Sequence, residues 1–397
     1  MIQVVGLAAA FALIVILTAK RINVALSIMI GSVALAILSG LSVQDFVNLF
    51  IRCLEDPQTV NLTLQVAAIG MLAFSMKETK LVDDLIAGLR TMLSSRVLVA
   101  VIPAVIGLMP MPGGALLSAP LIDKEADELK LTPERKVAVN LTFRHIWFYV
   151  FPLSSTLILA SGLAGINLYQ LILIQIPSFI LSIAMGYVLF LRGFKVDRRL
   201  QSEKAYGIVV EGLAPIAGAI ALNLAGLNLA ASVMLGVLAT LLIKRTRPSR
   251  AVGLLLKGIP WTSALSIVSV MMLRYTIEAS KAISILFSIL KEAMVPLVLF
   301  ATLFPFMIAG VSGLAIAGAG ISIPFILPLF QTNAPALVSM IVLSTYAGYY
   351  ISPLHLCLVL SNQYYKAKIH EVYRLWIPYL LMVCGLGIIL DMLILLR

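Results

Sequence analysis

Apolar runs of membrane-spanning length alternate with short polar connections along the whole chain. About 20 apolar residues are needed to cross roughly 30 Å of hydrocarbon, and runs of this kind leave no room for a soluble domain. The pattern therefore predicts an all-α polytopic membrane protein. The expected apolar segments cover residues 2–18, 24–40, 60–76, 97–122, 137–161, 167–191, 206–222, 226–243, 259–277, 294–330, 335–360 and 371–396.

A cluster of prolines and glycines interrupts the fourth apolar segment. Residues 108–120 read LMPMPGGALLSAP, and proline stops an α-helix. An unpaired backbone N–H or C=O costs several kcal/mol in hydrocarbon, so such a break is tolerated only where protein covers it or where it lines a water-filled cavity. The stretch therefore predicts a substrate-binding hairpin of a secondary transporter, in which broken helices meet near the midplane.

Two halves of similar organisation follow one another. Pro353 lies 201 residues after Pro152, and Pro378 lies 201 residues after Pro177. The segment lengths agree with this shift, so we expect an internal repeat. The N-terminal repeat covers residues 1–200, with a hairpin at about 97–122 and a broken helix at 137–161; the C-terminal repeat covers residues 201–397, with a hairpin at about 294–330 and a broken helix at 335–360.

Most of the 29 lysines and arginines fall on one side of the membrane if each hairpin returns to the side from which it enters. Basic residues in short loops favour the cytoplasm, and the bias disappears if both broken segments cross. We therefore expect two inverted repeats, each with five crossings and one re-entrant hairpin, with broken helices at the midplane. The expected location is the cytoplasmic (inner) membrane, with both termini extracytoplasmic.

The composition excludes a soluble globular protein. Hydrophobic residues make up 61% of the chain, charged residues 12%, and the mean hydropathy is +1.06, whereas soluble domains have about 25% charged residues. The net charge of +11 does not indicate a nucleic-acid partner, since the basic residues stand in loops between apolar segments. Cys53, Cys357 and Cys384 lack the spacing of a disulfide framework or a metal site, so no cofactor is expected beyond Na⁺ as a coupling ion.

Small residues of the two hairpins are candidates for substrate binding. Glycine lets the backbone approach a ligand, and helix N-termini offer free N–H groups and a partial positive charge to anions. In the second hairpin we expect breaks across residues 310–313 and 318–322. Close helix packing through small residues is the alternative interpretation. The candidates are Gly113, Gly114 and Ser118 in the first hairpin, and Gly318, Gly320 and Ser322 in the second.

The second pair of breaks is expected at the prolines of FPLSST and ISPLH. Proline removes one helical hydrogen bond and leaves carbonyl groups free, and neighbouring hydroxyls can complete a site for Na⁺. A plain proline kink is the alternative. The coupling-ion candidates are Ser154, Ser155, Thr156, Ser352 and His355, and Ser154 and His355 are also candidates for substrate binding.

Ionisable residues inside apolar segments are functional candidates. Arg144, next to His145, can hold a carboxylate or phosphate through its two-pronged donor face, or it can extend to the cytoplasmic surface. His355 can bind an anion or carry a coupling proton, or it is a neutral histidine bonded to a helix carbonyl. We expect Glu211 and Asp391 to lie at the membrane interface.

Residues 42–58, 77–96 and 278–292 mix charged and apolar residues at helical spacing. They are expected to form helices that lie in the membrane interface. The last two precede the hairpins and are candidates for arms that join a moving transport unit to a static scaffold. Plain connector helices are the alternative.

Three motifs resemble a known family. LMPMPGGALLSAP, FRHIWFYVFPLSSTLILAS and YYISPLHLCLVLSNQYY are together similar to an uncharacterised family of prokaryotic membrane proteins, domain-of-unknown-function family 401, of the ion transporter superfamily. Gluconate-type permeases and citrate, dicarboxylate and arsenite carriers are its relatives. The resemblance implies opposed hairpins, a homodimer formed through a scaffold domain, and elevator-like motion. Carried over by position, it implies one half-site of Gly113, Gly114, Ser118, Ser154, Ser155 and Thr156, and another of Gly318, Gly320, Ser322, Ser352 and His355.

These observations predict a secondary active transporter, not an enzyme. The expected substrate is a small organic anion, a carboxylate or a sugar acid, and transport is coupled to Na⁺ or H⁺. An ion channel or an anion exchanger is the alternative. A membrane-embedded enzyme is less favoured, because the chain has no HExxH motif and no paired intramembrane aspartates. The expected partners are the anionic substrate, the lipid bilayer and a second copy of the chain.

Overall fold

The computed structural model describes residues 2–109, 114–194, 203–292, 296–330 and 334–395, and these residues form helices joined by short turns. The first half contains α1 (Ile2–Ala19), α2 (Val24–Leu38), α3 (Val43–Glu55), α4 (Pro57–Glu78), α5 (Leu81–Met92), α6 (Ser95–Gly107), α7 (Ala115–Glu128), α8 (Pro133–His145), η1 (Ile146–Tyr149), α9 (Ser155–Ala164), α10 (Leu168–Gly186) and η2 (Tyr187–Leu191). The second half contains α11 (Glu203–Leu224), α12 (Leu229–Ile243), α13 (Pro248–Gly258), α14 (Trp261–Ser280), α15 (Ala282–Glu292), α16 (Leu297–Ser312), α17 (Ala315–Phe330), α18 (Pro335–Ile351), α19 (Leu356–Tyr365), α20 (Ile369–Leu380), η3 (Leu381–Gly385) and α21 (Leu386–Leu395).

The predicted all-α fold class is confirmed. Every predicted apolar segment contains a helix, and each of the four segments predicted to be broken contains two separate helices. Within the described residues, five helices are long and apolar enough to cross a membrane, or six if α13 and α14, bent by 43° at their junction, form one span. Other apolar helices, including α1, α2 and α12, are shorter. The ten crossings stay a prediction.

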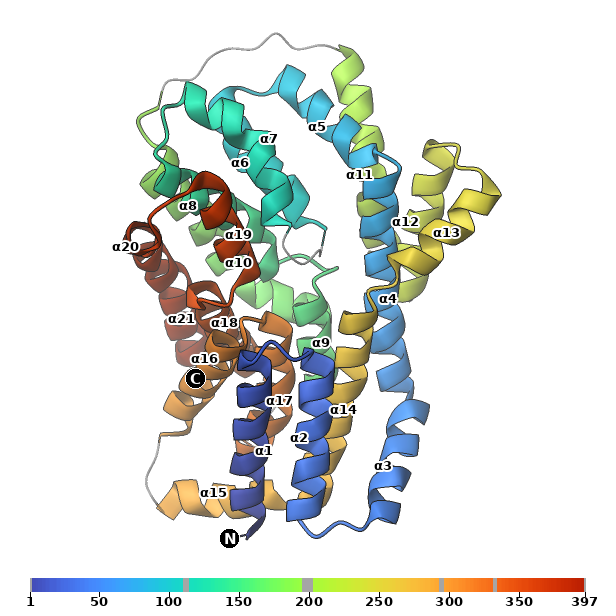
Figure 1. The fold of residues 1–397 in the computed structure, drawn as a ribbon, viewed down its shortest axis with the longest axis vertical. Helices are drawn as coiled ribbons and strands as arrows, with labels where there is room; N and C mark the ends of the chain where they lie inside the picture. Colours follow the sequence, from blue (N-terminus) through green and yellow to red (C-terminus); the bar gives the residue numbers. More distant parts are fainter. Residues whose placement is uncertain (1, 110–113, 195–202, 293–295, 331–333, 396–397) are drawn as a thin grey trace.

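The order of helices is the same in both halves. A long helix, a short amphipathic helix, a helical hairpin and a broken helix follow one another as α4 to α9 and again as α14 to α19. Figure 1 shows α5 at the top and α15 at the bottom, with α6 and α7 in the upper half and α17 in the lower half. We expect this placement for inverted repeats, and the side of the membrane on which each hairpin enters stays a prediction.

The first hairpin consists of α6 and α7, which pack against each other and against α8. Pro110, Pro112 and the predicted site residue Gly113 lie outside the described residues. Gly107 lets α6 approach α8 closely, because a Cβ atom at this position would collide with the backbone carbonyl of Arg144. Small residues permit such contact between backbones. The end of α6 therefore lies beside the end of α8.

The second hairpin breaks at one of its two predicted positions. α16 ends at Ser312, and Gly313 follows in a left-handed conformation with a φ of 68°, which glycine adopts without a steric penalty. Residues 318–322 lie within the continuous helix α17. The predicted break across residues 318–322 is therefore wrong.

The glycines of α17 allow close packing instead. A Cβ atom at Gly318 would collide with Thr345 of α18, and one at Gly320 would collide with Val270 of α14. Glycine is suited equally to a break and to a tight contact between helices. The small-residue interpretation therefore accounts for these two positions.

Both broken helices separate at the predicted prolines. α8 continues as the short 3-10 helix η1, and Pro152 lies in the gap before α9. In the second half, Pro353 lies in the gap between α18 and α19. The predicted positions of these two breaks are confirmed.

Each hairpin packs against the broken helices of both halves. α7 contacts α8 of its own half and α19 of the other half, and α17 contacts α18 of its own half and α9 of the other half. Each hairpin therefore contacts a broken helix of the other half. The second arms of the hairpins and the second halves of the broken helices therefore share one interior.

The three stretches predicted to be amphipathic helices are helical. They form α3, α5 and α15. α5 packs against α11, and α15 packs against α1, α14 and α17. Their position in the membrane interface stays a prediction.

Replacement of Gly348 by valine is expected to destabilise the helical bundle. Gly348 lies in α18, and a Cβ atom there would collide with the backbone carbonyl of Phe306 in α16. A branched side chain would force the two helices apart, and overpacking of this kind costs about 1–3 kcal/mol. The midpoint of thermal unfolding of the purified protein in detergent should fall.

Gly218→Ala is the matched control. This glycine of α11 has open space around the position of a Cβ atom, and alanine favours helix over glycine, so the midpoint should stay or rise. An unchanged midpoint for Gly348→Val would contradict the close contact of α16 with α18.

Candidate functional site

A cavity of about 230 Å³ lies where the broken helices meet the second hairpin. Its walls come from the ends of α6, α8 and α18, from η1, from the break after α16 and from the first turns of α9, α17 and α19, with one residue of α14. The lining residues are Gly107, Met109, Arg144, His145, Trp147, Phe148, Phe151, Leu153, Ser154, Ser155, Thr156, Ser263, Gly313, Leu314, Ile316, Tyr349, Leu356 and Cys357.

Three helices begin at this cavity. Ser155 and Thr156 open α9, Leu356 and Cys357 open α19, and Ile316 lies in the first turn of α17. The side chains of the N-cap residues Ser154 and His355 do not cap α9 and α19. The free N–H groups of a helix N-terminus carry a partial positive charge and attract anions. The backbone alone therefore makes the cavity attractive to negative charge.

Arg144 adds a full positive charge. It lies in the last turn of α8 and is buried, with 5% of its surface exposed. The guanidinium group lies against Gly114, the residue before α7, since a Cβ atom at Gly114 would overlap it. Gly114 thus provides the space that the charge occupies. The burial contradicts the alternative in which Arg144 extends to the cytoplasmic surface.

The predicted coupling-ion residues fall into two groups. Ser154, Ser155 and Thr156 line the cavity. Ser352 and His355 are buried at the second break and do not line it. The Ser352 Oγ accepts a hydrogen bond of 3.1 Å from a backbone N–H within the break. The two halves of the predicted cation site therefore do not share one surface, and the role of these residues stays a prediction.

Ser118 belongs to a buried hydrogen-bond network and does not line the cavity. Its Oγ donates to Oδ1 of Asn140 over 2.6 Å. The Asn140 Nδ2 donates to Ser361 over 2.9 Å and to the backbone carbonyl of Ala115 over 3.0 Å. The network joins α7, α8 and α19. Sequence reasoning missed Asn140, because a single amide inside an apolar run forms no pattern.

Gly318, Gly320 and Ser322 also lie away from the cavity, inside α17. The residues of the second hairpin that line it are Gly313, Leu314 and Ile316. Ser322 is fully buried, and its Oγ has no hydrogen-bond partner among the described residues. The observed break at Gly313 therefore provides the surface that was expected further along the hairpin.

His145 and Cys357 line the cavity, although sequence reasoning gave neither a role in binding. The ring of His145 lies near that of His355, with centroids 5.1 Å apart. His355 and Cys357 stand two positions apart in the sequence. This short spacing could have indicated a pair of metal-ligating side chains. His145 stands in the other half of the chain, and no spacing could connect it with them.

Asp391 is buried, whereas the sequence predicted a position at the membrane interface. Its exposed fraction is 2%, and its Oδ2 has no hydrogen-bond partner among the described residues. α21, which carries Asp391, packs against α10 and α18. Glu211 of α11 is exposed. A buried carboxyl group inside a membrane protein is a functional candidate.

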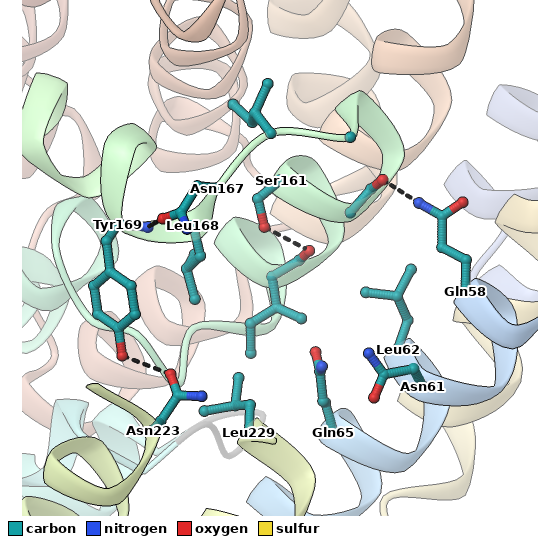
Figure 2. Close-up of a pocket in the computed structure, with 14 residues that line it drawn as sticks. Gln58, Asn61, Leu62, Gln65, Ser161, Asn167, Leu168, Tyr169, Asn223 and Leu229 are labelled. Carbon is teal, nitrogen blue, oxygen red and sulfur yellow. Dashed lines mark hydrogen bonds between the residues drawn. The ribbon is translucent and has the colours of Figure 1, made fainter. Parts of the chain in front are cut away.

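A second cavity, of about 410 Å³, lies between α4, α9, the start of α10 and the α11–α12 pair. Figure 2 shows Gln58, Asn61, Asn223 and Tyr169 around it. The Tyr169 hydroxyl donates to Oδ1 of Asn223 over 2.6 Å, and the Gln58 amide donates to the carbonyl of Gly162. Its described lining residues carry no charge, so the smaller cavity is the better anion site.

Comparison with known proteins identifies a family. No curated protein matches the sequence. The fold is similar to that of the Alcanivorax borkumensis YdaH transporter, whose crystal structure is described as having an unusual topology. The two chains are 15% identical, the match covers 89% of each, and the TM-score is 0.57. The family model described as "Protein of unknown function (DUF401)" matches residues 3–397. The chain therefore belongs to the DUF401 family of proteins.

Proposed function

We propose that the protein is a secondary active transporter of a small organic anion, driven by Na⁺ or H⁺. The observation that carries the proposal is a buried cation, Arg144, beside a cavity at which three helices begin. A buried positive charge beside helix N-termini attracts negative charge, so an anion is the ligand that suits this cavity. The similarity to a transporter of the same fold supports this reading.

The size and lining of the cavity indicate a short substrate with an apolar part. About 230 Å³ is below the roughly 300–1,000 Å³ of pockets for drug-sized ligands. Apart from Arg144 and the hydroxyl groups, apolar side chains such as Phe151, Leu314 and Leu356 form much of the wall. A sugar acid would leave several hydroxyl groups unpaired there, at about 1–3 kcal/mol each. A monocarboxylate with an apolar body fits better.

Alternating access requires one group of helices to move against another. We propose that the two hairpins and the two broken helices form the moving unit and that α4, α11, α12 and α14 belong to the scaffold, in an elevator-type motion. The contact of Gln58 in α4 with Gly162 in α9 crosses this boundary. Polar contacts of this kind can be exchanged for others when two surfaces slide. A homodimer formed through the scaffold belongs to the same proposal.

The buried Asp391 favours H⁺ over Na⁺ as the coupling ion. The carboxyl group of Asp391, whose Oδ2 has no hydrogen-bond partner among the described residues, can bind and release a proton as its surroundings change. The alternative Na⁺ site would use the hydroxyl groups of Ser154, Ser155 and Thr156, which face the cavity. The two ions can be distinguished in liposomes.

Arg144→Gln is expected to abolish the high-affinity site. A hydrogen bond to a charged group is worth about 1.5–3 kcal/mol, and 1.4 kcal/mol corresponds to tenfold in affinity. The apparent KM for uptake into liposomes should therefore rise about 10- to 100-fold. A panel of monocarboxylates, 2-oxo acids, dicarboxylates and sugar acids should be compared under an imposed ion gradient.

Arg247→Gln, a change at an exposed arginine before α13, should leave the apparent KM unchanged. Both variants are first checked for a single peak in size-exclusion chromatography. Saturable uptake with an unchanged KM in Arg144→Gln would rule out Arg144 as the binding cation. Flux that neither saturates nor needs a gradient would indicate a channel, and uptake that needs only internal anion would indicate an exchanger.

Asp391→Asn is expected to separate coupling from substrate binding. The neutral amide cannot carry the proton, so accumulation driven by a pH gradient should fall to background, while counterflow of labelled against unlabelled substrate should continue. Glu211→Gln, at an exposed position of α11, is the control and should keep both the accumulation and the counterflow of the unmodified protein. Accumulation that follows a Na⁺ gradient and is unaffected in Asp391→Asn would contradict H⁺ coupling through this residue.

A further inference from the structure

Three metal-ligating side chains meet where the two broken helices face each other. His145 ends α8, His355 immediately precedes α19, and Cys357 lies in the first turn of α19. Their ligand atoms all lie within 4.8 Å of one another. All three side chains are buried, with exposed fractions of 2%, 0% and 5%. The roles proposed above for Arg144 and Asp391 do not involve this cluster.

Three of the four imidazole nitrogens of the cluster lack a hydrogen-bond partner among the described residues. The Nδ1 of His145 lies 2.6 Å from the backbone carbonyl of Leu141, and because a carbonyl only accepts, Nδ1 carries the proton. Its Nε2 then has a free lone pair and no hydrogen-bond partner among the described residues. Neither nitrogen of His355 has one there either. Buried polar atoms are normally paired, and each that is not costs about 1–3 kcal/mol.

We propose that His145, His355 and Cys357 bind one Zn²⁺ ion, through one nitrogen of each imidazole and the thiolate. Imidazole and thiolate are the preferred ligands of zinc, at about 2.0 Å and 2.3 Å from the ion. These lengths place ligand atoms about 3.3–3.6 Å apart in a tetrahedron. The ligand atoms of the three side chains lie within 4.8 Å of one another. Small side-chain rotations on binding of the ion would bring them to these distances.

The surroundings of the cluster fit a metal site. The Leu141 carbonyl fixes the orientation and tautomer of His145, as the second partners of metal-binding histidines do. Aromatic rings enclose the cluster: the ring centroid of Phe148 is 4.8 Å from that of His145, and the ring centroid of Tyr349 is 4.0 Å from that of His355. An apolar shell of this kind keeps water away from the ligands.

Three protein ligands leave a fourth position open. Such an open position is typical of zinc that binds a further molecule, whereas structural zinc is closed by four protein ligands. Since His145 and Cys357 line the cavity, the open position faces it. Zinc and one thiolate together carry a single positive charge, which adds to that of Arg144. A carboxylate oxygen of a bound anion is a suitable fourth ligand.

Sodium, magnesium and calcium do not fit this cluster, because they prefer oxygen ligands. Cu⁺ accepts thiolate and imidazole as well, and it is the competitor to be tested. Zinc is proposed here because zinc sites with an open position take three protein ligands of the imidazole, thiolate and carboxylate types. Two histidines and one cysteine also form the ligand set of copper electron-transfer sites, so copper is the metal that the test has to exclude.

The test is the metal content of the full-length protein, purified in detergent without chelators, incubated with excess Zn²⁺ and then desalted. We expect about one zinc per chain by elemental mass spectrometry. Cys357→Ser and His355→Gln should each lower the retained zinc at least about tenfold. Cys384→Ser and His370→Gln are matched controls, at a second buried cysteine and at an exposed histidine, and they should retain it.

A second measurement covers the case in which a variant fails to fold. Wild-type protein stripped with a chelator and reloaded with Co²⁺ should show a thiolate-to-cobalt charge-transfer band, and addition of Zn²⁺ should remove it. Wild-type zinc no higher than in the two cluster variants, or a cobalt spectrum without the thiolate band, would overturn the proposal. So would stoichiometric Cu⁺ that excess Zn²⁺ does not displace. Metal content is read without transport, so the failure of this proposal and that of the transport proposal are distinguishable.

Discussion

The cost of an unpaired backbone group in hydrocarbon determines the design of this protein. A membrane helix that breaks must surround the break with protein or with a polar cavity. Pro152, Pro353 and Gly313 each interrupt a helix within an apolar segment, and their neighbours face a single interior cavity. The breaks satisfy the constraint together, since each is covered by the helices that belong to the others. A cavity lined by helix ends is the by-product of this arrangement.

The chemistry at that site follows from which ends of the helices meet. The first turns of α9, α17 and α19 face inward, so the backbone supplies donors and partial positive charge. Arg144 strengthens this field, and Gly114 makes room for its guanidinium. The same junction places two histidines and a cysteine from different halves within reach of one ion. A carboxylate and a metal ion are compatible occupants here, because each would supply the charge that the other needs.

Pro152 and Pro353 mark real interruptions, because a proline inside a helix removes a hydrogen bond, but Pro177 and Pro324 lie within helices. Neither proline nor glycine alone therefore predicts a break. Gly313 and Gly318 look alike in the sequence, yet one ends a helix and the other packs against Thr345, a difference that depends on the neighbouring helix. Asp391 stands near the end of an apolar run and resembles an interfacial residue, but α18 and α10 cover its helix. The contact of His145 with His355 and Cys357 depends on how the two halves pack, which no local pattern records.

The exchange of partners between the halves also bears on how the chain is made. α7 can contact α19 only after most of the second half has been synthesised. The hydrogen bond of Asn140 to Ser361 likewise forms only at that stage. Contacts between residues so far apart in sequence form late, because the closure of long loops is entropically unfavourable. During synthesis the first hairpin therefore has an uncovered amide network in the membrane, and the final helices complete both halves at once. Before the second half is synthesised, the first half therefore lacks the contacts that complete its interior.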